Sequence, residues 1–261
     1  MDKIMGLREQ PKTFGKIYRF PDGSYDIIAA NAPTFKPKGF EKAGAEKAAG
    51  AAKAPRVKRE PKKDKEDIER AQRRARAKLR RLALCNDFRW FVTLTIDPQK
   101  IDSFDEKAVV KRMSQWCSNQ VKRRGLKYVL VPEHHKSGRI HFHGFFTDVF
   151  PVVDSGKVDA GGRRVYNLPA WDYGFTTAIE LYGEYSSAVA YVCKYIGKQT
   201  EKIGGRWYYS GGALAQPREE YVDISAADVA EMFPEHWEKM VPGAVYAGVN
   251  GLRGDTENGS Q

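Results

Sequence analysis

The amino-acid sequence predicts an α+β fold in which a central antiparallel sheet carries helices on one face. Short segments with alternating apolar residues are interspersed with segments whose apolar residues recur at helical spacing. Their order is strand, helix, strand, strand, strand, helix, which is typical of an RRM-like or ferredoxin-like layout. In that order, the expected elements lie at residues 90–96, 104–124, 127–133, 139–147, 175–181 and 186–198.

Local signals justify these elements. Residues 90–96 (WFVTLTI) alternate between apolar and smaller or polar positions, as expected for a half-buried strand. Ser103 and Glu106 have the spacing of a capping box, and Gly125 is placed to end the helix that follows. The loop at residues 134–138 joins the next two strands as an antiparallel hairpin.

Composition shifts divide the chain of 261 residues into five segments. The first contains a hairpin around a Pro-Asp-Gly turn, and the second is a flexible basic linker rich in Ala, Lys, Gly and Pro. A basic helix, the main α+β domain, and a helix capped by Ser225 with a polar tail follow. The expected boundaries are 1–33, 34–64, 65–86, 87–222 and 223–261.

The charge balance favours a polyanionic partner. The formal net charge is +11, which suits nucleic acid better than an acidic protein or a small anion. Cys85, Cys117 and Cys193 form no CxxC pair, which fits a reducing cytoplasm, such as that of a bacterial host. No long uncharged apolar segment occurs, so we expect no membrane association.

The basic helix has two interpretations. Its Lys and Arg residues cover most of the circumference, so it is either a solvated helix or an arm that binds the DNA backbone. For the second interpretation, the candidate DNA-binding residues are Arg73, Arg74, Lys78, Arg80 and Arg81.

Four of the five histidines lie within ten residues of one another. His141 and His143 are two apart on an expected strand, so both rings project from one face and can bind one metal ion. Glu133 has matching parity on the neighbouring strand if the hairpin loop has an odd length, and His135 could replace it as the third ligand. Alone, the HxH pattern is more typical of ordinary surface histidines.

A second constellation lies on the last expected helix. Tyr191, Lys194 and Tyr195 share one face, which presents two phenols beside an ammonium group. A phenol needs such a cation, or a metal-bound phosphate, to gain phenolate character as it attacks. Alone, a YxxxY pattern indicates only half-buried helix aromatics.

Together these motifs resemble those of a known family. The segments FVTLT, HFHGFF and YVCKYIGK, in this order, are similar to the three motifs of HUH rolling-circle replication initiators, particularly the two-tyrosine proteins of bacteriophages and some plasmids. The resemblance covers roughly residues 89–214 and implies an HUH endonuclease fold for the main domain.

The resemblance implies a nicking and strand-transfer enzyme. His141, His143 and Glu133 would bind Mg²⁺ or Mn²⁺, and Tyr191 would attack the phosphorus of single-stranded origin DNA. This leaves a 5′-phosphotyrosine and a free 3′-OH, and Tyr195 would make the second cut. Lys198 would contact the DNA. The sequence contains no GxxxxGK[ST] motif, so unwinding would need a host helicase beside the host polymerase.

Two alternatives remain open at this point. An HUH transposase or relaxase uses the same chemistry, although relaxases usually carry a third histidine in the motif and have longer chains. A non-enzymatic RRM-like module would bind nucleic acid through its basic helix and aromatic tail, without needing metal. Base stacking would then fall to Trp207, Tyr208 and Tyr209, which a buried strand explains equally well.

Overall fold

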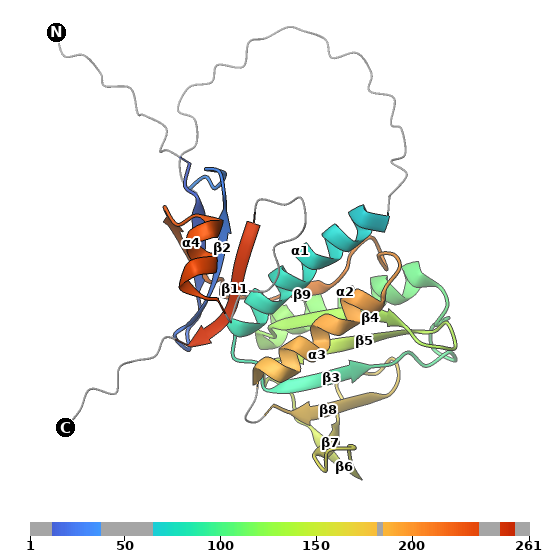
Figure 1. Cartoon of the computed structure of the whole chain (residues 1–261). Coiled ribbons are helices and arrows are strands. Elements are labelled where there is room, and N and C mark those ends of the chain that lie inside the picture. Colours follow the sequence, from blue (N-terminus) through green and yellow to red (C-terminus); the bar gives the residue numbers. More distant parts are fainter. Residues whose placement is uncertain (1–11, 38–64, 182–184, 235–245, 254–261) are drawn as a thin grey trace, which may run out of the picture. The chain divides into compact units, whose positions relative to one another are not determined.

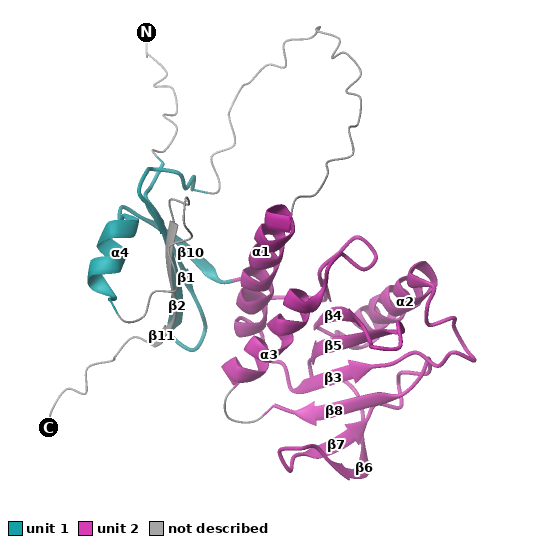
Figure 2. Ribbon diagram, turned by 45° about the vertical axis from the view of Figure 1, so that its right-hand side comes forward, with its two compact units in different colours: residues 1–61, 217–261 teal, residues 62–216 magenta. Residues whose placement is uncertain are grey.

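The computed structural model describes residues 12–37, 65–181, 185–234 and 246–253. The chain forms two compact units (Figure 2). Residues 62–216 make up the central unit, and residues 1–61 together with 217–261 make up the terminal unit. Both ends of the chain therefore contribute to one unit.

The central unit is built on a seven-stranded antiparallel sheet with the strand order β6-β7-β8-β3-β5-β4-β9 (Figure 1). The expected order of strands and helices is confirmed. The elements are α1 (Lys65–Leu84), β3 (Trp90–Leu94), α2 (Glu106–Arg124), β4 (Tyr128–His134), β5 (Ile140–Phe146), β6 (Val153–Val158), β7 (Arg164–Asn167), β8 (Thr176–Glu180), α3 (Tyr185–Lys198) and β9 (Tyr209–Gly211).

The expectation that all helices lie on one face of the sheet is wrong. Helix α2 packs against one face, in a core that includes Phe142 and Phe146 of β5. Helices α1 and α3 pack against the other face, where Phe145 of the same strand is buried (Figure 1). Because β5 carries large apolar side chains on both sides, both faces need cover, as in buried strands generally.

Helix α2 begins differently from the expectation and ends as expected. Asp105, not Ser103, is the N-cap, and its side chain accepts a hydrogen bond from the backbone N–H of Ala108. Ser103 lies before the helix and is fully buried. At the other end, Gly125 adopts the left-handed conformation with φ 68° and closes the helix.

Two strands occupy a segment in which no strand was expected. Strands β6 and β7 lie within the Gly-rich stretch between residues 149 and 173 and extend the sheet beyond β8. Five of the six residues of β6 are exposed, so this strand lacks the apolar alternation by which strands are recognised.

The terminal unit contains a four-stranded sheet with the order β10-β1-β2-β11 and one helix. The expected hairpin is confirmed, with Gly23 in its turn at φ 83°, and so is the cap at Ser225, which forms a capping box with Asp228. The elements are β1 (Gly15–Arg19), β2 (Ser24–Ala30), β10 (Arg218–Val222), α4 (Ala226–Met232) and β11 (Tyr246–Arg253).

The two units divide the chain at other points than the composition suggested. Helix α1, expected as a separate segment, packs against α3 within the central unit. Strand β10, expected at the end of the main domain, pairs with β1 in the terminal unit. The expected linker, 34–64, lies outside the described residues except for 34–37, where Phe35 bridges to Thr13.

Candidate active site

The paired histidines lie on β5, beside a carboxylate on β4. Residues Glu133 and His141 are directly opposite each other in the antiparallel ladder, and five loop residues separate the two strands. The odd-length loop therefore gives the expected parity, with the side chains of Glu133, His141 and His143 on the face that α3 partly covers.

Gly144 allows β5 to run close to β4. A Cβ atom at this position would collide with the backbone carbonyl oxygen of Val129. The glycine that follows the two histidines therefore has a steric reason, because any larger residue would push β5 away from β4.

His143 is buried and only partly hydrogen-bonded. Its Nδ1 lies 3.1 Å from Oγ1 of Thr93, while Nε2 lies 3.1 Å from Oε2 of Glu133. That second distance suits a hydrogen bond but the geometry does not, so Nε2 is buried without a hydrogen bond. Burial lowers the pKa of His143 to about 4, although Glu133 acts in the opposite direction. The ring is therefore neutral at pH 7 and its free nitrogen faces a carboxylate.

His141 lies further from this pair. Its ring stacks on that of His135 at 4.9 Å, and its centroid is 6.4 Å from that of His143. Burial lowers the pKa of His141 as well. Within the described ranges, no three His, Cys, Asp or Glu side chains converge closely enough to bind a metal ion as they stand. The closest approach to a metal site is the contact between His143 and Glu133.

The two tyrosines of α3 form a contact chain with His143. The rings of Tyr195 and His143 stack with centroids 4.2 Å and planes 4° apart. The hydroxyl group of Tyr195 donates a hydrogen bond of 2.8 Å to the hydroxyl oxygen of Tyr191. The sequence placed the tyrosines on one helix face and the histidines on one strand face, and the fold brings the two faces together.

The tyrosines differ in exposure and in proton affinity. Tyr195 is 7% exposed, and burial together with its hydrogen bond to Tyr191 raises its pKa. Tyr191 is 49% exposed. Tyr195 therefore stays a neutral donor, and a donor to the oxygen of Tyr191 stabilises negative charge that develops there.

The lysine that reaches this cluster is Lys198. Its Nζ lies 3.3 Å from Oε1 of Glu133 and 4.7 Å from the centroid of the Tyr195 ring. Lys194, expected between the tyrosines, is exposed and makes no hydrogen bond, ion pair or ring contact with the part of the chain that the structure describes. Two helical turns separate Lys198 from Tyr191, so a search limited to i+3 and i+4 neighbours misses it.

Two further side chains support the site and were not singled out from the sequence. Thr93 is the neighbour of His143 on β3, and the alternation of that strand already placed it on this face. Gln199 follows Lys198 and donates a 2.7 Å hydrogen bond to the carbonyl oxygen of Pro132. That bond ties the end of α3 to β4 beside Glu133, but a local sequence signal for it is lacking.

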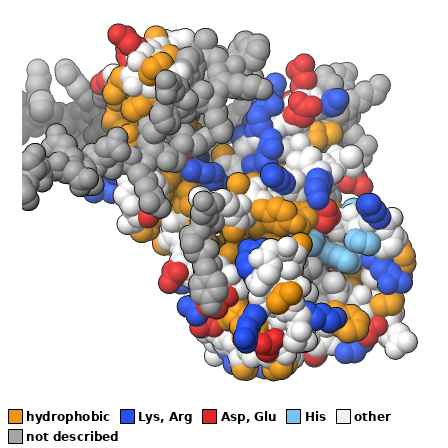
Figure 3. Space-filling model, turned by 60° about the horizontal axis from the view of Figure 1, so that its bottom comes forward, with side chains coloured by type: hydrophobic (Ala, Val, Ile, Leu, Met, Phe, Trp, Pro, Cys, Tyr) orange, Lys and Arg blue, Asp and Glu red, His pale blue; other side chains and the backbone are white. Residues whose placement is uncertain are grey.

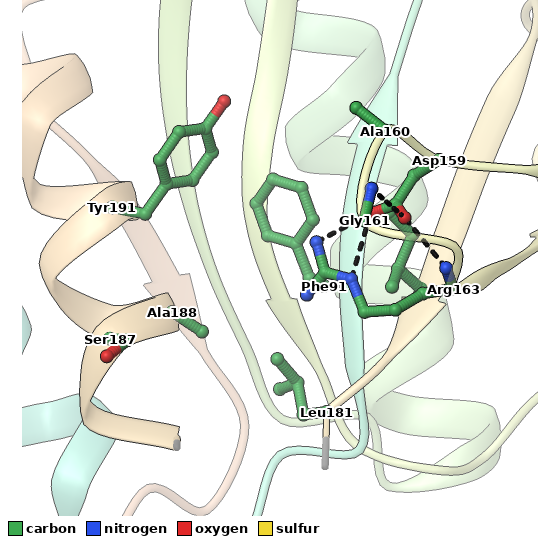
Figure 4. A pocket seen from close by; sticks show the side chains of 10 residues that line it. Phe91, Asp159, Ala160, Gly161, Arg163, Leu181, Ser187, Ala188 and Tyr191 are labelled. Carbon is green, nitrogen blue, oxygen red and sulfur yellow. Dashed lines mark hydrogen bonds and ion pairs between the residues drawn. The ribbon is translucent and has the colours of Figure 1, made fainter. Parts of the chain in front are cut away.

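A cavity of about 660 Å³ opens beside Tyr191 (Figure 4). Phe91 of β3 lines it, and the Phe91 ring meets the Tyr191 ring edge to face at 5.8 Å. The loop between β6 and β7 forms the opposite rim. In the space-filling view, the histidines lie on the surface beside hydrophobic side chains, with Lys and Arg side chains around them (Figure 3).

The basic helix α1 is not solvated on all sides. Ala75 and Leu79 lie on a face that is buried in the core shared with α3. Arg73, Arg74 and Lys78 are exposed. The other two candidates for DNA binding are half-buried and make interactions within the protein: Arg80 and Arg81.

The aromatic residues before β9 are poor candidates for base stacking. Trp207 and Tyr209 are buried, and Tyr209 donates a hydrogen bond to the carbonyl oxygen of Ile203. Tyr208 is half-buried. An aromatic side chain that does lie open to solvent beside the sheet is Phe175, just before β8, which is 81% exposed.

Together, the fold and this cluster define a protein with a His-x-His strand and a tyrosine pair on a helix that packs against the same sheet face. Residues 89–200 match the family model of the replication-associated protein ORF2 family, and this part of the chain belongs to that family. The expected resemblance to rolling-circle replication proteins is thereby confirmed. No curated protein and no solved structure matched the chain. None of the helices in the described ranges combines the length and apolar character needed to cross a bilayer.

Proposed function

We propose that the chain initiates rolling-circle replication by nicking single-stranded origin DNA and remaining covalently attached to it. The observation that carries this proposal is the chain of contacts from His143 through Tyr195 to Tyr191. A general nucleic-acid-binding module has no need for a buried, hydrogen-bond-deficient histidine stacked on one of two linked phenols.

Tyr191 is the nucleophile of the first cut. Its oxygen forms a bond to the scissile phosphorus and the bond from phosphorus to the 3′ oxygen breaks. The phenol proton is transferred, in net terms, to the 3′ oxygen. The products are a 5′-phosphotyrosine and a free 3′-OH, so the number of phosphate ester bonds is unchanged and cleavage consumes no nucleotide.

The unequal exposure of the tyrosines supports this order. Tyr191 is accessible, whereas Tyr195 is nearly buried and donates its proton to the Tyr191 oxygen. Once Tyr191 is esterified, its oxygen is a weaker acceptor and Tyr195 is released for the second cut or strand transfer. Lys198 balances the charge of Glu133 and lies close to the reacting hydroxyl groups.

The residues present fit a divalent metal ion. A neutral histidine nitrogen without a hydrogen bond lies 3.1 Å from a carboxylate oxygen, and a cation would relieve the unfavourable approach of these two electron-rich atoms. His143 and Glu133 would hold Mg²⁺ or Mn²⁺, with His141, or His135 in its place, as a further ligand. Such an ion polarises the scissile phosphate and neutralises charge in the transition state.

The partners follow from this chemistry. The substrate is single-stranded origin DNA, with the exposed residues Arg73, Arg74 and Lys78 of α1 as candidate phosphate contacts. The half-buried Arg80 and Arg81 are weaker candidates. A host helicase and a host polymerase would unwind the duplex and extend the free 3′-OH.

The test is covalent capture. The purified protein is incubated with labelled single-stranded DNA from its own replicon, with Mn²⁺ or with EDTA, and denaturant-resistant adducts are mapped by mass spectrometry. We expect an adduct at Tyr191 that requires metal. Tyr191→Phe should abolish it while DNA binding persists, and Tyr195→Phe should still permit the first cut.

Tyr208→Phe is the matched control, because this tyrosine lies outside the site and should leave adduct formation intact. Cleavage by Tyr191→Phe at the wild-type rate would reassign the nucleophile. DNA binding that is indifferent to EDTA and yields no adduct on any segment of the replicon would overturn the enzyme in favour of a binding module.

A further inference from the structure

The cavity beside Tyr191 has an apolar floor. Phe91, Ile179 and Leu181 contribute side chains to it from the sheet, and Tyr191 lines its wall from α3 (Figure 4). Its volume of about 660 Å³ lies within the range of pockets that enclose small ligands, roughly 300–1,000 Å³. The chemistry proposed above does not use this space, since it needs only the hydroxyl end of Tyr191.

The rim opposite Tyr191 is held in a defined shape. Asp159 accepts two hydrogen bonds from the Arg163 guanidinium, from Nε at 2.8 Å and from Nη2 at 2.6 Å. The same carboxylate accepts backbone N–H groups of Gly161 and Arg163, which closes the loop between β6 and β7. The Arg163 side chain is nevertheless 58% exposed, so its plane and remaining N–H groups are oriented and accessible.

We propose that this cavity binds one base of the DNA strand, next to the phosphate that Tyr191 attacks. The inference rests on the proposed function, because it takes that attack to place the scissile phosphate at the Tyr191 hydroxyl group. The nucleotides on either side of this phosphate then lie within one sugar unit of the cavity mouth. A nucleobase has the flat apolar faces that Phe91 can stack against and polar edges that Arg163 can donate to.

Charge and position favour a base over other occupants. The cavity shares Tyr191 with the candidate active site, so an unrelated ligand there would obstruct the strand. The rim adds a cation and the floor adds an aromatic ring, which is the combination that single-strand binding sites use. The cavity thereby makes Arg163 and Phe91 positioning and specificity residues for the strand.

The experiment measures binding separately from cleavage. In EDTA, the affinity of the full-length protein is compared for homopolymeric single-stranded oligonucleotides and for oligomers of equal length with an abasic backbone. The ratio of the two affinities reports base contacts alone, because phosphate contacts occur in both. Phe91→Leu keeps the bulk that packs against Phe145, and Arg163→Ala removes the guanidinium.

We expect both variants to lower the ratio by about 5-fold to 100-fold, the effect of losing one stacked base. Arg164→Ala is the matched control: Arg164 is the next residue, is exposed, pairs with Asp154 and does not line the cavity, so the ratio should not change. A ratio that stays at the wild-type value in both Phe91→Leu and Arg163→Ala would overturn the base pocket.

The outcome is independent of the covalent test. A wild-type protein that forms the Tyr191 adduct but shows no loss of ratio in the variants keeps its proposed function and loses the pocket. Conversely, a protein that forms no adduct but shows the loss keeps a base-binding cavity and loses the nicking mechanism. If both hold, an abasic site placed beside the mapped cut should slow adduct formation in the wild type and have less effect in Phe91→Leu.

Discussion

The two faces of the seven-stranded sheet serve different purposes. Under α2 the strands contribute a continuous apolar core, in which Val92 and Leu94 of β3 are fully buried. On the opposite face, Thr93 of the same strand contacts His143, and α1 and α3 leave part of the sheet accessible. Because side chains alternate along a strand, one short segment can supply stability on one side and chemistry on the other.

The comparison predicts opposite consequences for adjacent residues of β5. Phe142→Ala removes a fully buried ring from the core under α2 and should cost about 3–5 kcal/mol of unfolding free energy. His141→Ala removes a partly exposed side chain and should cost about 1 kcal/mol or less, while it impairs adduct formation. Urea unfolding measures both, and equal losses from the two variants would contradict the division between the faces.

The accessible face should also make stability depend on pH. Burial lowers the pKa of His143 from 6.5 to about 4, so between these values the unfolded chain binds a proton that the folded protein does not. Stability should therefore fall as pH decreases from 6.5 to 4, by about 3 kcal/mol, and this contribution should be fully present above pH 6.5.

The measurement is urea unfolding in EDTA at successive pH values. The quantity of interest is the difference between the wild type and His143→Gln, because other carboxylates titrate equally in both. A difference that does not vary with pH would mean that His143 is more solvated than its position under Tyr195 indicates.

A smaller effect separates the two lysines of α3. Lys198→Met removes the cation beside Glu133 and Tyr195 and should slow formation of the covalent adduct about tenfold, or about 1.4 kcal/mol in the barrier. Lys194→Met should change the rate much less. If Lys194→Met were instead the slower variant, the expectation drawn from helical spacing would be restored.

Much of this face could be anticipated from local patterns. The alternation of β3 and β5 defines which side chains share a face, and the length of the hairpin loop sets Glu133 opposite His141. The helical repeat places Tyr191 one turn from Tyr195. These relations depend on residues close in sequence, and they were sufficient to bring the principal candidates into one cluster.

What could not be anticipated depends on packing between distant segments. The side of the sheet that each helix covers is set by the combined apolar surface of all the strands, so the second layer of helices was missed. Strands β6 and β7 are exposed and carry no periodic signal, and the loop between them lines the cavity beside Tyr191. The stacking of Tyr195 on His143 likewise follows only from how α3 packs.

The terminal unit imposes an order on biosynthesis. Its inner strands, β1 and β2, leave the ribosome first, but their partners β10 and β11 follow only after the whole central unit has been translated. A hairpin of two strands is marginally stable alone, whereas the central unit has its own core and can fold while the chain is still growing. Completion of the terminal sheet therefore marks a chain translated through β11, and a prematurely terminated chain would retain the tyrosines and histidines without it.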